Sequence, residues 1–111
     1  MTIKELIDLN LFQVINEGNN IEQKISKPYC CDLLSIAMSS APADGIWFTV
    51  MGNINTLAVA ELTEISCIVL SHNATFDAVA LEKAKKEGIT VLSTDLPSFD
   101  AAILVYKKLN R

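Results

Sequence analysis

The second half of the chain repeats one pattern three times: a short apolar run, a polar turn, and a run with helical spacing. The apolar runs are Ile46 to Met51, Ile65 to Leu70 and Ile89 to Leu92. Strands that alternate with helices form a mainly parallel sheet, because each helix returns the chain to the starting edge. Right-handed crossovers place the helices on the faces of the sheet. The pattern predicts an α/β three-layer sandwich with helices on both faces.

Several residues mark the expected ends of these helices. Asn53 or Asn55 is available to cap the helix after the first strand, and Gly88 ends the helix after the second. Pro97 suits the first turn of the last helix. Trp47 and Phe48 lie next to each other in the first strand, so we expect one to pack on each side of the sheet.

The first half of the chain has a less regular pattern. Thr2 and Glu5 form a capping box for a first helix. Two short alternating runs, Leu11 to Ile15 and Ile21 to Ile25, flank a turn cluster and predict a small N-terminal hairpin. Pro28 indicates that Lys27 to Cys31 starts extended.

A helix is expected after this extended segment. Asp32 is placed to cap it, and the inward positions are then Leu33, Leu34, Ala37 and Met38.

Length and charge limit the domain count and the partners. A chain of 111 residues that is 50% hydrophobic builds one core, so residues 1–111 are expected to form a single domain. The net charge of -4 argues against a nucleic-acid partner, because such proteins cluster Lys and Arg. No apolar run approaches the roughly 20 residues that span a bilayer, and the N-terminus does not have the pattern of a signal peptide. We therefore expect a cytoplasmic protein with no membrane partner.

The three cysteines do not indicate a disulfide framework. Cys67 lies in an apolar run and is expected in the core. Cys30 and Cys31 are neighbours on an extended segment, so one is expected to be buried and the other exposed. A redox or metal role for this pair is disfavoured, because the spacing is not Cys-x-x-Cys.

Small polar residues follow all three predicted strands. The carboxyl ends of parallel strands share one rim of the sheet, where α/β proteins bind ligands. We expect a small ligand there, either nucleotide-like or anionic, and no cofactor. The candidate ligand-binding residues are Gly52, Asn53, Asn55, Ser71, His72, Asn73, Ser93, Thr94, Asp95 and Ser98. Helix capping is an equally good interpretation of Asn53, Asn55 and Asp95.

Catalytic and metal chemistry lack their usual signatures. The chain has no Gly-x-x-x-x-Gly-Lys phosphate loop, and its one histidine is His72. A nucleophile such as Cys30 or Cys31 would need that histidine nearby, and no local pattern favours this pairing. Zinc needs three or four ligands at recognisable spacing. The sequence predicts neither an enzyme nor a metal site.

Four segments together resemble the DRTGG domain: Tyr29 to Ser35, Gly45 to Thr49, Asn55 to Ala60, and Glu87 to Asp95. The resemblance extends over nearly the whole chain. That domain is similar to the N-terminal domain of HPr kinase/phosphorylase, and it occurs as a non-catalytic module in phosphotransacetylases and in some CBS-containing pyrophosphatases. The resemblance implies a three-layer α/β fold, self-association, and a regulatory or ligand-binding role.

The residues that name the family are changed in this chain. Asn53 and Ile54 stand where the family has Asp-Arg, and Ser71, His72 and Asn73 stand where it has Thr-Gly-Gly. An Arg would bind a carboxylate or phosphate through two hydrogen bonds, which Ile54 cannot do. The expected rim is therefore lined by neutral hydrogen-bonding groups.

Three functions remain, and the first is preferred. It is a regulatory or sensor module that binds a small ligand and forms a homodimer. A homodimer is expected because a small chain with this apolar content has apolar surface to spare. The second is an interaction module that docks on a partner enzyme without a ligand of its own. The third is an enzyme of unknown reaction.

Overall fold

The apolar runs pair side by side to form one five-stranded sheet. The structure is a computed structural model that describes residues 1–110. Its sheet has the strand order β1-β5-β4-β3-β2, in which β1 is antiparallel to β5 and all other neighbours are parallel. The strands are β1 Gln13–Asn16, β2 Pro28–Cys30, β3 Ile46–Thr49, β4 Cys67–Leu70 and β5 Val91–Ser93.

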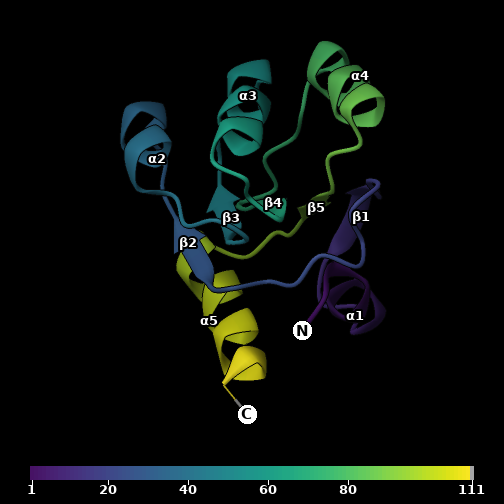
Figure 1. Ribbon diagram of the computed structural model, residues 1–111, viewed down its shortest axis with the longest axis vertical. Coiled ribbons are helices and arrows are strands. Elements are labelled where there is room, and N and C mark those ends of the chain that lie inside the picture. Colours follow the sequence, from purple (N-terminus) through teal and green to yellow (C-terminus); the bar gives the residue numbers. More distant parts are fainter. Residues whose placement is uncertain (111) are drawn as a thin grey trace.

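Helices lie on both faces of this sheet (Figure 1). On one face lie α2, α3 and α4, and on the other lie α1 and α5. Their bounds are α1 Ile3–Asp8, α2 Leu34–Ser40, α3 Ile54–Leu62, α4 Ala78–Glu87 and α5 Ser98–Leu109. The predicted three-layer α/β sandwich is thus confirmed. No helix among these is long and apolar enough to cross a bilayer.

The core has two halves, one on each side of the sheet. All residues of β3 and β4 are buried, as expected for strands covered on both faces. Phe48 packs with α1 and α5, whereas Trp47 packs with the side chains of α2, α3 and α4. Phe12 meets Phe48 edge to face with ring centroids 6.0 Å apart. The prediction that Trp47 and Phe48 take opposite sides is confirmed.

The predicted helix ends are largely confirmed. The Thr2 hydroxyl accepts a hydrogen bond from the Glu5 N–H, and the Glu5 carboxylate accepts one from the Thr2 N–H, which lowers the pKa of Glu5. Asn53 caps α3, and Gly88 ends α4 in the left-handed conformation with φ 69°. Left-handed backbone is the usual end of a helix at glycine.

The predicted N-terminal hairpin is wrong. The structure has β1 at Gln13–Asn16, but residues 21–25 form a turn and an isolated bridge rather than a strand. The Asn20 amide donates a hydrogen bond to the Ser66 carbonyl and accepts one from the Thr90 hydroxyl, each over 2.8 Å. The segment therefore packs across the amino ends of β4 and β5, and β1 pairs with β5 instead.

The predicted cap of α2 is also wrong. Asp32 does not cap this helix. Its carboxylate accepts hydrogen bonds from the Thr49 hydroxyl at 2.8 Å and from the Val50 N–H at 2.9 Å. Ala37 is the fully buried residue of α2, whereas Leu33 and Met38 are exposed.

The expected burial of the cysteines is confirmed for Cys67 and only in part for Cys30 and Cys31. Cys67 is buried in β4, and burial raises its pKa to about 12. Cys30 is exposed on the edge strand β2, and Cys31 is half-buried. All three are free thiols.

Candidate functional site

The start of α3 uses Gly52 and Asn53 for structure, whereas the side chain of Asn55 is exposed. The Asn53 side chain accepts hydrogen bonds from the Asn55 N–H at 2.9 Å and the Thr56 N–H at 3.3 Å, so it is a cap. A Cβ at Gly52 would overlap the Thr75 carbonyl oxygen. Gly52 is therefore required for the close passage of two backbones rather than for ligand contact.

Ser71 and Ser98 form a second structural pair. Ser71 is fully buried at the end of β4, and its hydroxyl is hydrogen-bonded to the Ser98 hydroxyl at the start of α5. Buried hydroxyls are satisfied by such partners. This contact joins β4 to α5 and leaves Ser71 inaccessible to a ligand.

The turn after β4 has an unusual backbone at two residues. His72 and Asn73 have φ values of 55° and 59°, in the left-handed region that glycine adopts without cost. The family pattern has Gly-Gly at these two positions. The His72 N–H donates to the Leu96 carbonyl at 2.9 Å, and the Asn73 N–H donates to the Thr94 carbonyl at 3.0 Å. These bonds hold the turn against the loop after β5.

Four of the predicted site residues line a hollow at the rim. Asn73, Ser93, Thr94 and Asp95 surround a cavity of about 330 Å³ together with Leu11, Phe12 and Gln13. A second cavity of about 290 Å³ shares Gln13, Asn73 and Ser93 with the first. Its other lining residues are Ile15, Leu70, Ala74, Thr75, Phe76 and Leu81. We call these two adjoining cavities the rim pocket.

One wall of the rim pocket comes from β1, which the sequence did not place there. Gln13 is paired with Ser93 in the antiparallel ladder between β1 and β5. Because β1 runs antiparallel to β5, its amino end lies at the rim where β5 ends. Leu11, Phe12 and Gln13 were missed because the expected hairpin directed this segment elsewhere. The alternating run from Leu11 to Ile15 did predict a strand, but nothing in the sequence identified the strand with which it pairs.

The chemistry of the rim pocket is neutral to acidic. Gln13 and Asn73 carry amides, Ser93 and Thr94 carry hydroxyls, and Asp95 carries a carboxylate. The described lining residues include no Lys, Arg or His. The expected cap role of Asp95 is wrong, because the residue before α5 is Pro97 and no side chain caps that helix. Asp95 is exposed at the mouth of the pocket.

The residues considered for catalysis are not part of this pocket. His72 lines neither cavity, although it neighbours Asn73. Within residues 1–110, no three His, Cys, Asp or Glu side chains converge in a way that could hold a metal ion.

Asp32 is a rim residue that was interpreted only as a cap. Its bonds to Thr49 and Val50 link the loop after β2 to the end of β3. It therefore has a structural role at the rim.

Comparison with known proteins shows the fold. No protein-family model and no curated protein matches the sequence. Among solved structures, the chain is similar to the CBS and DRTGG domains of the regulatory region of Clostridium perfringens pyrophosphatase, complexed with the activator diadenosine tetraphosphate. The TM-score is 0.73 at 18% identity, covering 94% of this chain and 45% of that chain. The DRTGG-like fold implied by the resemblance is confirmed.

Proposed function

We propose that this chain is a non-catalytic regulatory module that binds a nucleoside-like small molecule in the rim pocket. The observation that carries the proposal is the convergence of β1, β4 and β5 on one pocket, through Gln13, Asn73 and Ser93. Ligands of α/β sheets bind at this carboxyl end. The neighbouring fold belongs to a regulatory region, which supports regulation over catalysis.

The lining of the rim pocket favours the nucleoside part of a nucleotide over its phosphates. Phe12 lines one cavity and Phe76 lines the other, so each offers apolar surface to a ring on its own side of the sheet. The amides of Gln13 and Asn73 line both cavities and offer donors and acceptors to the edge of the ring. A carboxylate such as Asp95 accepts hydrogen bonds from ribose hydroxyls, as acidic residues do in dinucleotide-binding folds. Phosphates would extend into solvent, since the lining carries no cation for them.

The similar regulatory region supports the same class of ligand. It was crystallised with diadenosine tetraphosphate, which has two nucleoside ends. The similarity covers less than half of that chain, so it supports the class of ligand only. The position of the ligand is inferred from the geometry of the rim pocket.

The test is a titration of the full chain with adenosine, ATP, diadenosine tetraphosphate and inorganic phosphate, followed by calorimetry. We expect saturable binding of the three adenosine-containing compounds and no binding of inorganic phosphate. Asn73→Gly should weaken binding about fivefold, because it removes one side-chain hydrogen bond of about 1 kcal/mol. His72→Gly is the matched control, since it has the same backbone region and lines neither cavity. Binding of phosphate alone, or equal binding by both variants, would contradict the proposal.

Self-association is the second part of the proposed function. It is favoured by apolar side chains that remain exposed on α5, away from the rim pocket. Phe99 is 71% exposed and Tyr106 is 53% exposed. Exposed aromatic residues that share one surface are typical of protein interfaces.

A further inference from the structure

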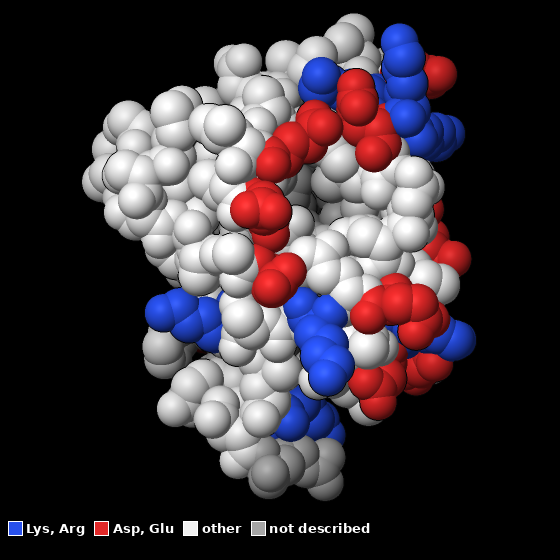
Figure 2. Space-filling model, viewed as in Figure 1, with Lys and Arg blue, Asp and Glu red and all other residues white. Residues whose placement is uncertain are grey.

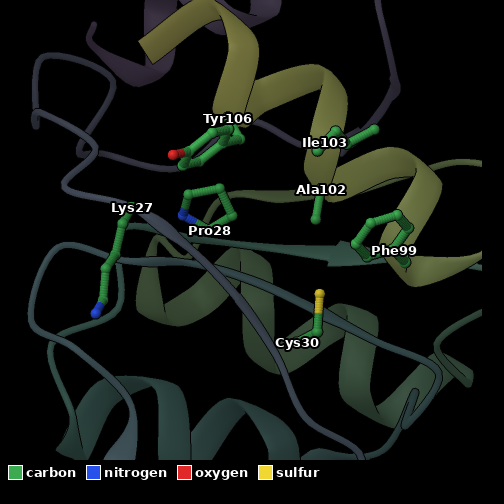
Figure 3. Close-up of a pocket in the computed structure, with 7 residues that line it drawn as sticks. All are labelled: Lys27, Pro28, Cys30, Phe99, Ala102, Ile103 and Tyr106. Carbon is green, nitrogen blue, oxygen red and sulfur yellow. The ribbon is translucent and has the colours of Figure 1, made fainter. Parts of the chain in front are cut away.

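An apolar groove runs between the edge strand β2 and helix α5 (Figure 3). Its volume is about 340 Å³. Phe99 lies beside Cys30 at one end, and Tyr106 lies over Pro28 at the other. The lining residues are Lys27, Pro28, Cys30, Phe99, Ala102, Ile103 and Tyr106, and we call this surface the α5–β2 groove.

Helix α5 has apolar side chains on two faces. Ala101 and Val105 are buried in the core beneath the helix. Phe99, Ile103 and Tyr106 follow the spacing i, i+4, i+7, so they form one stripe along the helix beside the groove. In a helix that packs only against its own core, the residues outside the core-facing stripe are mostly polar. The stripe on α5 therefore indicates a second packing partner.

Charged residues flank this stripe in a self-complementary order. Asp100 follows Phe99 and Lys107 follows Tyr106, so both lie on the same side of the stripe, near opposite ends of the helix. Within residues 1–110, ion pairs join Lys4 to Asp8 and Lys83 to Glu87, and neither Asp100 nor Lys107 takes part in one. A second α5 laid antiparallel on the first would place each Asp100 against the partner's Lys107.

On the face shown in Figure 2, acidic side chains of residues 1–110 are absent around α2 and β2. Figure 2 shows that the Asp and Glu side chains visible in this view gather away from the side of the molecule that holds α2 and β2. The chain has a net charge of -4, so two copies repel each other wherever their acidic surfaces meet. Contact through the side that holds β2 keeps the acidic side chains visible in this view away from the partner copy.

We propose that a second copy of this chain covers the α5–β2 groove, with the two α5 helices antiparallel about a two-fold axis near Ile103. Such an interface is isologous: the protruding Phe99 of each copy enters the groove of the other, and each Asp100 pairs with Lys107 across the axis. This inference specifies the self-association part of the proposed function. It is independent of the rim pocket, which shares no lining residue with the groove.

The first test is the oligomeric state of the full chain by sedimentation equilibrium. We expect a dimer at micromolar concentration, and we expect Phe99→Asp to weaken association at least about 100-fold, because it places a charge inside the partner's apolar groove. Val79→Asp is the matched control: Val79 is 65% exposed on α4, outside the groove, and its substitution should leave the dimer intact. A monomeric wild-type chain, or a dimer that survives Phe99→Asp, overturns the proposal.

The second test concerns the antiparallel geometry. Asp100→Lys and Lys107→Asp should each weaken the dimer about tenfold, because each turns two attractive pairs into repulsive ones. The double variant restores the pairs in reversed order and should regain most of the lost affinity. Equal losses without rescue would rule out this arrangement. Adenosine titration of the folded Phe99→Asp monomer tests ligand binding separately from self-association. The rim pocket of this variant should still bind adenosine.

Discussion

The backbone N–H of Asn73 donates a hydrogen bond to the carbonyl of Thr94 over 3.0 Å, and this bond ties the turn after β4 to the loop after β5. It brings two residues that are 21 positions apart to the same wall of the rim pocket. The left-handed backbone of His72 and Asn73 makes this turn sharp enough for the contact. The turn therefore links the fold to the proposed binding site.

The left-handed turn predicts how stability responds at His72. His72→Val should lower the free energy of unfolding by about 1–2 kcal/mol, because a β-branched residue is strained at φ 55°. His72→Gly should be neutral or stabilising by up to about 1 kcal/mol. Urea unfolding followed by the fluorescence of Trp47, the single tryptophan, measures both. A destabilising glycine would mean that the His72 side chain contributes more than the strain costs.

The close passage at Gly52 predicts a sensitive position. Gly52→Ala should destabilise the chain by about 1–3 kcal/mol, because its Cβ would overlap the carbonyl of Thr75 and push the two loops apart. The same urea experiment measures the loss. An unchanged midpoint would show that the loop containing Thr75 moves at no cost.

The carboxylate of Asp32 predicts a measurable coupling to Thr49. Asp32→Ala should cost about 1–3 kcal/mol, because it leaves the buried Thr49 hydroxyl and the Val50 N–H without their acceptor. The double variant Asp32→Ala with Thr49→Val should cost less than the sum of the two single changes. If the losses of the two single variants add exactly in the double variant, the hydrogen bond between Asp32 and Thr49 contributes nothing to stability, which would contradict this prediction.

The buried Cys67 predicts a fall in stability at high pH. Burial raises its pKa in the folded chain to about 12, from 9.0 for an ordinary thiol. The folded state therefore holds this proton more tightly, so the stabilisation is fully present below pH 9 and is lost as pH rises towards 12. Each pH unit above 9 should remove up to about 1.4 kcal/mol.

The control for this prediction is Cys67→Ala. Burial, followed by the Asp32 carboxylate, also raises the pKa of Cys30, and burial raises the pKa of Tyr29. These two groups therefore lower the unfolding free energy at high pH in both proteins. The part that belongs to Cys67 is the difference between wild type and Cys67→Ala in unfolding free energy, measured at pH 8 to 10. Parallel curves for the two proteins would contradict the assigned burial.

The fold was predictable where one local pattern determines the structure. Trp47 and Phe48 lie in a short apolar run that is typical of a strand covered on both faces, and Gly88 ends α4 because glycine adopts φ 69° without strain. Residues 21–25 show where prediction from local patterns fails. Their alternation fits a strand, but the side chain of Asn20 binds Ser66 and Thr90, which are far away in the sequence. Long-range hydrogen bonds of this kind leave no local signal.

The candidate site was predictable only in part for the same reason. Asn73, Ser93, Thr94 and Asp95 follow parallel strands, so their shared rim follows from topology. Gln13 reaches that rim because β1 pairs antiparallel with β5, and nothing in its neighbourhood in the sequence specifies that partner. The burial of Ser71 against Ser98 depends on the position of α5 on the sheet.

Titration of the isotope-labelled chain with adenosine, followed by amide NMR, tests the central claim most directly. The account predicts saturable shifts at Gln13, Asn73, Ser93, Thr94 and Asp95, together with unchanged signals from Phe99 and Tyr106 in the α5–β2 groove. The absence of shifts at any adenosine concentration, or shifts confined to the groove, would contradict it.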